Sequence, residues 1–254
     1  MLELDGVSII YTVRGKELAA VENASLVCPE GKICALIGPS GCGKSSLVQA
    51  AAGLKKIASG RLLVGGKDVR STRENTAVIF QDFGLLPWKT VAQNAELPLL
   101  LRGIARGERR GRVAPILEEL GLSPFASFYP LRLSGGLRQR VAIARALASD
   151  PDLLLMDEPF SSLDTLTRES LQDKLLEVAA RRKMSILIVT HSIEEAAFLA
   201  DSIYVMKGRI PGRVACFVEA PRPRSASFRT SASFFKLCVA VRTCLESKAE
   251  GADR

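Results

Sequence analysis

One glycine-rich loop has residue types and a spacing suited to binding phosphate. It reads Gly38-Pro39-Ser40-Gly41-Cys42-Gly43-Lys44-Ser45. Glycines let backbone N–H groups curl around phosphate oxygens, and a helix after the loop would add its positive N-terminal end. Lys44 can neutralise the β- and γ-phosphates of a nucleotide, and Ser45 can ligate Mg²⁺. The alternative is a tight glycine turn that binds nothing, which a strand before the loop and a helix after it disfavour.

Two adjacent carboxylates supply a second kind of chemistry. Asp157 and Glu158 directly follow the apolar run Leu153–Met156. Side chains alternate along a strand, so the two carboxylates point in different directions. Asp157 would hold Mg²⁺, directly or through water, and Glu158 would polarise an attacking water as a general base. The alternative is a pair of solvated acids, but their place after a phosphate loop favours catalysis.

A second glycine-containing stretch, Leu133–Arg140, reads LSGGLRQR. Gly135 and Gly136 leave backbone N–H groups open at a predicted helix N-terminus, and Ser134 adds a hydroxyl, so the stretch can bind an anion. Because the chain already has a phosphate loop, a second anion site suggests a phosphate shared between two chains. The alternative is an ordinary capped helix.

Buried parallel strands must position these groups. Apolar runs such as Leu153–Met156 and Ile186–Val189 are typical of strands covered on both faces. Each run ends in polar residues, and open α/β sheets place their sites at the carboxyl edge. Further predicted elements are strands at Ser8–Thr12, Ala24–Val27 and Ile33–Ile37, and a helix at Lys44–Ala52.

Between Asp82 and Asp150 the composition predicts helices, because Leu, Ala, Arg and Glu dominate. The last of these helices has Ser134 as N-cap and ends before Pro151, and its apolar spacing runs through Leu137, Val141, Ala144 and Leu147. After about Gly212 the pattern weakens. There we predict a turn at Pro221–Ser225, a short helix at Phe234–Leu245 and frayed final residues.

Bulk properties set the class of protein. The 254 residues carry 35 Lys and Arg against 27 Asp and Glu, a net charge of +8, which suits phosphorylated ligands, nucleic acid or an anionic membrane surface. The six cysteines form no C-x-x-C pair, so we expect free thiols rather than a zinc site or a disulfide framework. The acidic N-terminus does not resemble a secretory signal, and we expect a cytoplasmic protein.

Taken in order, these motifs resemble those of ATP-binding-cassette (ABC) ATPases, and the resemblance runs from about Leu2 to Gly212. It implies an α/β fold: a P-loop NTPase (RecA-like) core with a mainly parallel sheet, an N-terminal antiparallel β subdomain and an inserted α-helical subdomain at about 82–150. Residues 1–212 would form the ATPase domain, and 213–254 a C-terminal extension of unknown role.

The resemblance assigns roles to single residues. Tyr11 would stack on adenine, Gln81 would sense Mg²⁺ and the attacking water, and His191 would lie near the γ-phosphate; packed or structural roles are the alternatives for Tyr11 and His191. The implied catalytic residues are Lys44, Gln81, Glu158 and His191. The implied Mg²⁺ ligands are Ser45, Gln81 and Asp157. The implied ATP-binding residues are Tyr11, Gly38, Pro39, Ser40, Gly41, Cys42, Gly43, Lys44, Ser45, Ser46, Ser134, Gly135, Gly136 and, in a D-loop that crosses a dimer interface, Asp164.

The segment Gln81–Val91 is similar to the importer subgroup for nitrate, sulfonates, taurine or pyrimidine precursors. Trp88 would contact a membrane permease, with core filling as the alternative. The implied partners are a second ATP-binding subunit, expected as a homodimer, two integral membrane permease subunits and an extracytoplasmic solute-binding protein. The protein would lie peripherally on the inner face of the cell membrane, with no nucleic acid as partner. The alternatives are a soluble ABC ATPase acting on nucleic acid or ribosomes, a non-catalytic cassette and an exporter subunit.

Two basic clusters remain. We interpret both as solvated surface, with anionic headgroups as a possible partner. One comprises Arg102, Arg106, Arg109, Arg110 and Arg112, and the other Arg213, Arg222, Arg224 and Arg229.

Overall fold

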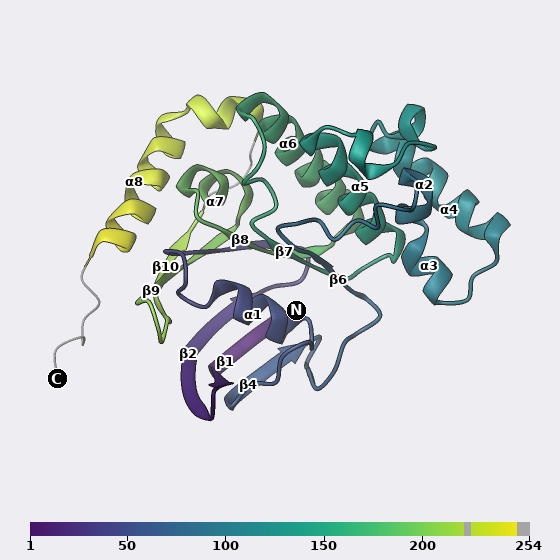
Figure 1. The fold of residues 1–254 in the computed structure, drawn as a ribbon. Helices are drawn as coiled ribbons and strands as arrows, with labels where there is room; N and C mark the ends of the chain where they lie inside the picture. The colour runs from purple at the N-terminus through teal and green to yellow at the C-terminus, as the bar shows by residue number, and fades with distance from the viewer. Residues whose placement is uncertain (221–224, 248–254) are drawn as a thin grey trace.

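A computed structural model describes residues 1–220 and 225–247 of the chain, which form two β-sheets with helices packed around them (Figure 1). The predicted turn at Pro221–Ser225 is described only at Ser225, which precedes a short 3₁₀ helix. Pro221 to Arg224 and the final residues 248–254 lie outside the described residues, and with them Arg222 and Arg224 of the second basic cluster and the predicted frayed end.

The larger sheet has six strands in the order β10-β9-β3-β8-β7-β6. Five of them are parallel to one another, and β10 alone runs antiparallel, against β9. Every residue of β3, β7 and β8 is buried, as expected for apolar strands covered on both faces. The strands are β3 (Ile33–Ile37), β6 (Thr76–Ile79), β7 (Leu153–Asp157), β8 (Ser185–Thr190), β9 (Ser202–Lys207) and β10 (Arg213–Glu219).

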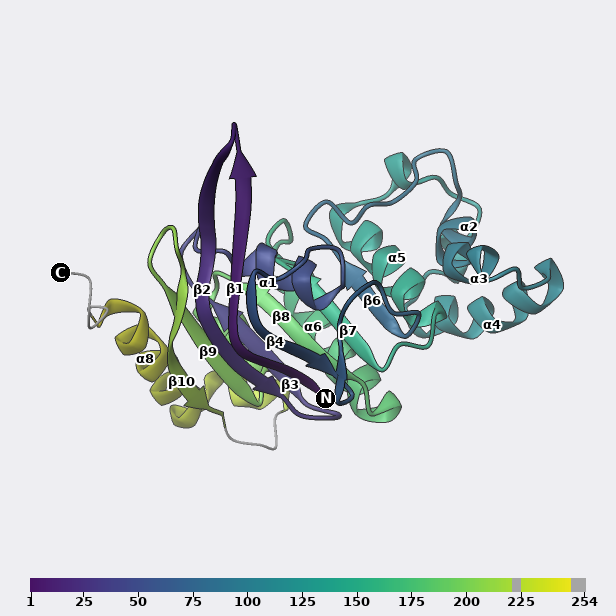
Figure 2. The ribbon, with the colours of Figure 1, turned by 90° about the horizontal axis from the view of Figure 1, so that it is seen from below.

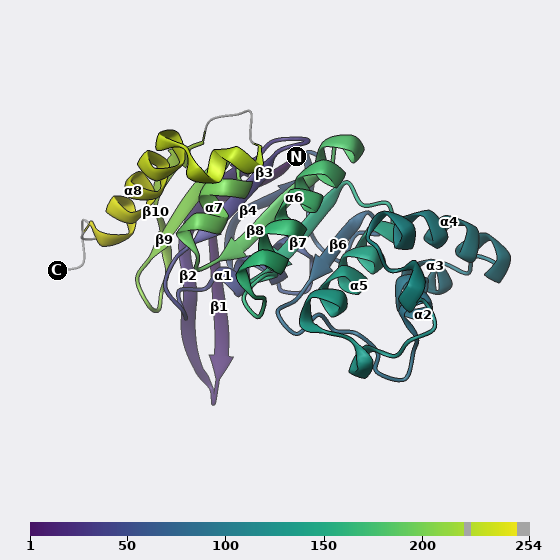
Figure 3. The ribbon, with the colours of Figure 1, turned by 90° about the horizontal axis from the view of Figure 1, so that it is seen from above.

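The side chains of β3 point alternately into two hydrophobic cores, one on each face of the sheet. Ile33, Ala35 and Ile37 face one core, while Cys34 and Leu36 face the other. The first core is completed by α5 (Gly135–Ala148), α6 (Thr165–Arg182) and α7 (Ile193–Leu199), which Figure 3 shows on one side of the sheet. The second core is completed by α1 (Lys44–Ala51) and the N-terminal sheet. The sheet therefore separates α1 from α5.

The N-terminal sheet is antiparallel, in the order β2-β1-β4-β5. Its first two strands are longer than predicted, and Figure 2 shows their hairpin projecting well beyond the body of the molecule. The strands are β1 (Leu2–Val13), β2 (Lys16–Cys28), β4 (Ser59–Val64) and β5 (Lys67–Asp68). Together with the parallel sheet and the helical insert, this sheet confirms the predicted fold class.

Every regular element between β6 and β7 is helical, as predicted. Buried Asn94 ties the segment before α2 to that helix by accepting from Leu86 N (2.9 Å) and donating to the Leu86 and Lys89 carbonyls. Ser134 caps α5, accepting a hydrogen bond from Leu137 N at 3.3 Å. The other elements are α2 (Val91–Ala95), α3 (Leu97–Leu101), α4 (Arg106–Glu119) and the 3₁₀ turns η1 (Ser123–Phe125) and η2 (Pro130–Arg132).

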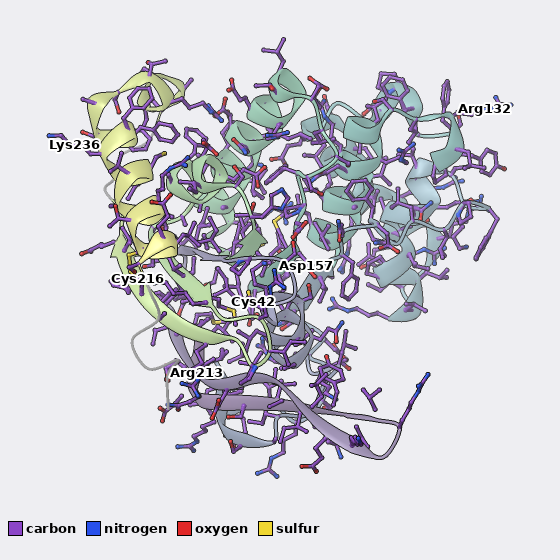
Figure 4. All side chains as sticks on the ribbon, turned by 60° about the vertical axis from the view of Figure 1, so that its left-hand side comes forward. Cys42, Arg132, Asp157, Arg213, Cys216 and Lys236 are labelled. Atoms are coloured by element: carbon purple, nitrogen blue, oxygen red, sulfur yellow. A yellow bond between two sulfur atoms is a disulfide. The ribbon has the colours of Figure 1, made fainter. Side chains whose placement is uncertain are left out.

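The segment after Gly212 adds β10 to the sheet and places α8 (Ala232–Glu246), after the 3₁₀ helix η3 (Ala226–Thr230), beside α7. Cys216 and Cys244 form a disulfide between β10 and α8, so the expectation that all six cysteines are free thiols was wrong (Figure 4). The sequence contains no local pairing signal for these two residues, because the fold brings them together across 28 positions. No helix among the described residues is both long enough and apolar enough to cross a membrane.

The interpretation of the basic clusters as solvated surface is wrong for Arg109 and Arg229, which are mostly buried, whereas Arg102 is exposed as predicted. Arg229 is mostly buried, with hydrogen bonds to Asp173 and Gln172 and its guanidinium 3.4 Å from the centroid of the Phe198 ring. Arg102 donates to the carbonyls of Ser149 and Glu74, and Arg109 to that of Ile104. Long arginine side chains can satisfy backbone carbonyls while their stems pack.

Candidate functional site

The phosphate loop connects the buried end of β3 to the start of α1. Gly41 and Gly43 have φ values of +81° and +93°, a conformation that disfavours side chains. A Cβ on Gly43 would also come within 2.5 Å of Val21 Cγ2 and 2.8 Å of the Ala20 carbonyl oxygen. The glycines are therefore required by the shape of the loop itself, which leaves its N–H groups free of side-chain cover.

Lys44 places its ammonium inside this loop. Its Nζ donates to the carbonyl oxygens of Gly38 (2.8 Å) and Pro39 (2.9 Å), and the residue is only 5% exposed. No acidic residue occupies the first turn of α1, and no side chain caps it. The positive charge of Lys44 and the positive end of α1 thus act at the same place, which favours an anion.

Gly212, which the sequence analysis did not assign to the site, supports the loop from behind. A Cβ at this position would lie 1.8 Å from the carbonyl oxygen of Cys42. The Gly212 N–H donates to the Ala20 carbonyl, and its own carbonyl accepts from Glu22 N, both at 3.0 Å. The available signal was a single glycine after Pro211, which does not reveal contact with a loop 170 positions earlier.

Asp157 lies at the end of β7 beside the loop, and Figure 4 shows it close to Cys42. Asp157 is only 9% exposed, and its Oδ1 atom has no hydrogen-bond partner among the described residues. Burial raises the pKa of Asp157, while a hydrogen bond from Ser45 and the charge of Lys44 act in the opposite direction. A buried carboxylate oxygen without a partner, next to a serine hydroxyl, fits a Mg²⁺ ligand set of hard oxygens.

Glu158 and His191 meet one position beyond the ends of neighbouring strands. His191 Nδ1 lies 3.3 Å from Glu158 Oε2, and the histidine side chain is 57% exposed while the glutamate side chain is mostly covered. Glu158 has a left-handed backbone (φ +49°), and its N–H donates to the Val189 carbonyl at 2.9 Å. Pairing of β7 with β8 therefore brings together two residues that are 33 positions apart.

Within the described part of the chain, two further predicted residues, Gln81 and Tyr11, make no hydrogen bond or ion pair with the Glu158–His191 pair or with Asp157, and only Tyr11 contacts the segment that follows the loop. Gln81 follows β6 at the same sheet edge, because Ile79 pairs with Met156, and its side chain is exposed. Tyr11 lies over α1, where its hydroxyl is 3.2 Å from Ser46 Oγ, and Lys55 Nζ is 3.8 Å from its ring centroid.

Ser134, Gly135 and Gly136 start α5 on the opposite side of the sheet from α1. Arg132, just before them, lies far from Cys42 in Figure 4. Within one chain the structure therefore does not bring this stretch to the phosphate loop.

The stretch instead lies beside the segment Ser161–Asp164, which the family resemblance predicts to be the D-loop. A Cβ on Gly135 would be 3.7 Å from Leu163, and one on Gly136 would be 2.5 Å from Thr167 Cγ2. Asp164 in that loop caps α6, and the hydrogen bond from the Thr167 N–H lowers its pKa.

Sequence reasoning also missed a group of side chains around His191, namely Thr190, Glu195 and Arg168. Glu195 accepts a hydrogen bond from the Thr190 hydroxyl at 2.6 Å and lies 3.7 Å from Arg168 Nε. The available signal was weak, since a threonine before a histidine and a glutamate in a helix are common on their own.

Known proteins resemble this chain in sequence over almost its whole length. A profile of the ABC transporter family matches residues 21–161. The taurine import ATP-binding protein TauB of Rhizobium johnstonii is 41% identical over 255 residues, which cover 97% of this chain and 97% of that protein. The nitrate import ATP-binding protein NrtD of Synechocystis sp. is 36% identical over 255 residues, with 97% and 96% covered.

Solved structures resemble it as well. The dimeric ATP-binding cassette MJ0796, in a post-hydrolysis state bound to ADP and Pi, superposes with a TM-score of 0.78 and 30% identity, covering 88% of this chain and 100% of that one. The cbiO1 protein of Clostridium perfringens, part of the ABC transporter complex cbiONQ, gives a TM-score of 0.77 and 26% identity, with 95% and 94% covered.

Proposed function

The chain belongs to the ABC transporter family, and we propose that it is the ATP-binding subunit of an importer for a small anionic or polar solute of the taurine or nitrate type. As a member of this family it binds and hydrolyses ATP. The observation that carries the proposal is the meeting of Lys44, Asp157, Glu158 and His191 at one sheet edge, in a chain that matches an import protein from end to end.

ATP binding uses the loop and α1. The Gly38–Ser46 backbone and hydroxyls surround the phosphates, and Lys44 exchanges its two carbonyl contacts for the β- and γ-phosphate oxygens. Tyr11, at the edge of α1, stacks on the adenine. The preformed loop keeps the conformational cost of binding low.

Ser45 and Asp157 would hold Mg²⁺, with Gln81 reaching it from the same sheet edge. The unpaired Oδ1 of Asp157 supports this assignment. When bound, Mg²⁺ neutralises charge on the β- and γ-phosphates.

Hydrolysis depends on the pair at the strand ends. Glu158 orients a water and accepts its proton as a general base, and Gln81 helps to place that water. His191, in contact with Glu158, lies near the γ-phosphate and stabilises the charge that develops on it.

The remaining part of the site comes from a second copy of the chain. Because α5 begins on the other side of the sheet, Ser134, Gly135 and Gly136 of one subunit cap the γ-phosphate held by the other, and Asp164 lies at the interface. A relative of the same fold is dimeric, which supports this arrangement. ATP closes the dimer because it binds the closed form better than the open form.

A contact with the permease explains why several large apolar side chains are exposed together around Trp88. The indole residue is 70% exposed, so the alternative of core filling was wrong. Val91 N donates to the Phe128 carbonyl, which holds the Trp88 segment beside exposed Phe128, Tyr129 and Leu131. Aromatic residues gathered in this way suit a protein interface, here with the integral membrane permease at the inner face of the membrane.

The alternative of a soluble ATPase acting on nucleic acid or ribosomes finds no support in the fold. Such proteins would need a long coiled-coil insertion or a second cassette. The longest helix between β6 and β7 has 14 residues, and the described residues contain one phosphate loop.

Two measurements test the proposed function. The purified chain should hydrolyse ATP, and Glu158→Gln should lower turnover by about 100-fold or more with unchanged ATP affinity, because general-base contributions are of this size.

In cells lacking the protein, uptake of labelled taurine or nitrate should fall, and the wild-type chain should restore it. Trp88→Ala should keep ATPase activity but fail to restore uptake. Unchanged uptake of both solutes in the deleted cells would contradict the proposed transport role.

A further inference from the structure

His191 lies in a turn of two residues, His191 and Ser192, between β8 and α7. Thr190 is the last residue of the strand, Ser192 is the N-cap of the helix, and α7 begins at Ile193. Such a turn needs fixed partners on both sides if the exposed imidazole is to keep one position.

Glu195, in the first turn of α7, supplies these partners. Its Oε2 accepts from the Thr190 hydroxyl at 2.6 Å, and its N–H donates to Ser192 Oγ at 3.2 Å. Thr190 Oγ1 in turn accepts from Ser192 N at 3.0 Å. The three hydrogen bonds join the residues before and after His191 to one glutamate.

The same carboxylate also faces the D-loop through Arg168. Glu195 Oε1 lies 3.7 Å from Arg168 Nε, and Arg168 Nη2 donates to the Leu163 carbonyl at 2.7 Å. Leu163 directly precedes Asp164, the cap of α6. A continuous set of contacts thus runs from the D-loop backbone to the His191 turn.

Burial makes the hydrogen bonds of Glu195 strong constraints, whereas its contact with Arg168 Nε is an ion pair without a hydrogen bond. Glu195 is 5% exposed, and burial raises its pKa against the opposing effects of Thr190 and Arg168. A buried, ionised carboxylate is stable only when both of its oxygens have partners. A change in the position of Arg168 therefore alters the hydrogen bond that the Glu195 carboxylate accepts from the Thr190 hydroxyl.

We propose that Glu195 is a positioning residue that fixes the turn carrying His191 and connects this turn, through Arg168, to the D-loop. The proposal rests on the proposed role of His191 in hydrolysis. It gives dimer closure a physical route to the reacting groups: contact of a partner with the D-loop sets Arg168, Arg168 sets Glu195, and Glu195 sets the imidazole beside Glu158.

The chain offers a clean probe, because His191 is its only histidine. With tag histidines removed, the imidazole Cε1–H gives a single NMR signal. Glu195→Gln, which keeps the side-chain shape but not the charge, and Thr190→Val, which removes the hydroxyl, should both shift and broaden that signal. Thr190→Ser should restore it. Thr243→Val, the same change at an exposed position of α8, is the matched control and should leave the signal unchanged.

The variants that change the NMR signal of His191 should also hydrolyse ATP more slowly. In Glu195→Gln and Thr190→Val, kcat should fall about tenfold or more while KM for ATP stays within about twofold, because misplacement of a reacting group by an ångström costs rate rather than binding. Arg168→Met should lower kcat in the same direction without changing KM. Equal thermal midpoints of Glu195→Gln and the wild type will show that the loss does not come from unfolding.

The variants distinguish a failure of the positioning role of Glu195 from a failure of the proposed role of His191 in hydrolysis. If His191→Ala keeps full turnover, the proposed role of His191 fails, whatever the signal does. If His191→Ala loses turnover but Glu195→Gln and Thr190→Val leave both the His191 signal and kcat unchanged, the positioning role of Glu195 is overturned.

Discussion

The phosphate loop and the start of α5 are two glycine-rich helix N-termini built from similar parts but supported in different ways. Both lack acidic residues in the first helical turn, which leaves the positive end of the helix available to an anion. The loop is enclosed by its own chain, with Lys44 buried inside it and Gly212 behind it. The α5 start instead has Ser134 exposed on the other side of the sheet.

The difference indicates which part of the site one chain completes alone. In the proposed function, the loop, Asp157 and the Glu158–His191 pair supply most of the groups that would bind the phosphates and Mg²⁺. The α5 start, on the other side of the sheet, would bind only the phosphate held by a second subunit. We therefore expect changes at the loop to lower ATP binding by single chains, and changes at the α5 start to leave that binding unchanged and to weaken the dimer.

The largest effect is expected for Lys44→Ala. Loss of the buried ammonium leaves the phosphates without their main countercharge, so ATP affinity should fall about 100-fold or more, in line with about 3 kcal/mol for a charge-assisted contact. Isothermal titration calorimetry measures this directly. Arg132→Ala, which removes an exposed charge just before the α5 start, is the matched control and should leave the affinity unchanged. Equal losses for both variants would remove the distinction between the two regions.

A pair of glycine changes compares the support behind each region. Gly212→Ala puts a methyl group 1.8 Å from a backbone carbonyl, which cannot move without displacing the loop, so we expect a loss of about 3 kcal/mol or more in unfolding free energy. Gly136→Ala meets only the Thr167 methyl group at 2.5 Å, which a side-chain rotation relieves. It should cost about 1 kcal/mol.

Denaturant titration of both variants, with ATP affinity measured on the folded protein, checks this comparison. Gly136→Ala should retain the ATP affinity of the wild type, and Gly212→Ala should not. A larger loss of stability for Gly136→Ala would mean that the α5 start is the more rigid of the two.

Asp157→Asn should stabilise the protein while abolishing Mg²⁺-dependent hydrolysis. Burial raises the pKa of Asp157 in the folded state, so the unfolded chain loses the carboxyl proton of Asp157 at a lower pH than the folded chain does. The contribution of the group to stability is therefore full below its unfolded pKa and is lost as pH rises through the folded value. The variant should melt a few degrees higher at pH 8, and the gap should shrink as pH falls toward 4, as followed by circular dichroism. A lower melting temperature for the variant at pH 8 would contradict the unpaired carboxylate.

The smallest effects on stability are expected at Ser134. Asp and Asn cap helices as well as Ser does, so Ser134→Asp and Ser134→Asn should each change the unfolding free energy by no more than about 0.5 kcal/mol. Only Ser134→Asp adds a negative charge where a partner's phosphate would bind. Thermal melts of the two variants check the caps, and a loss above about 1 kcal/mol in either would mean that Ser134 has a packing role as well.

The sequence predicted the parts of the site that depend on local order. The apolar run before Asp157 and the strand–loop–helix order around Lys44 both occur in the fold with nearly the expected bounds, because buried strands and glycine loops carry strong local patterns. Ser134 caps its helix as expected, since capping is decided within one turn.

What the sequence could not predict depends on contacts between distant segments. Gly212 meets the phosphate loop, and Cys216 meets Cys244, only because the fold brings these segments together. Likewise the role proposed for Glu195 depends on Arg168, which lies on another helix. Such pairings follow from how sheets and helices pack, which a pattern along the chain does not encode.

The most direct test of the shared site is the state of association of the Glu158→Gln protein in ATP and Mg²⁺, measured by size-exclusion chromatography with light scattering. A shared site predicts a dimer for Glu158→Gln and for its Ser134→Asn derivative. It predicts a monomer with unchanged ATP affinity for the Ser134→Asp derivative, because the added charge faces the partner's phosphate. An equally stable ATP-dependent dimer in the Ser134→Asp derivative would contradict the shared site.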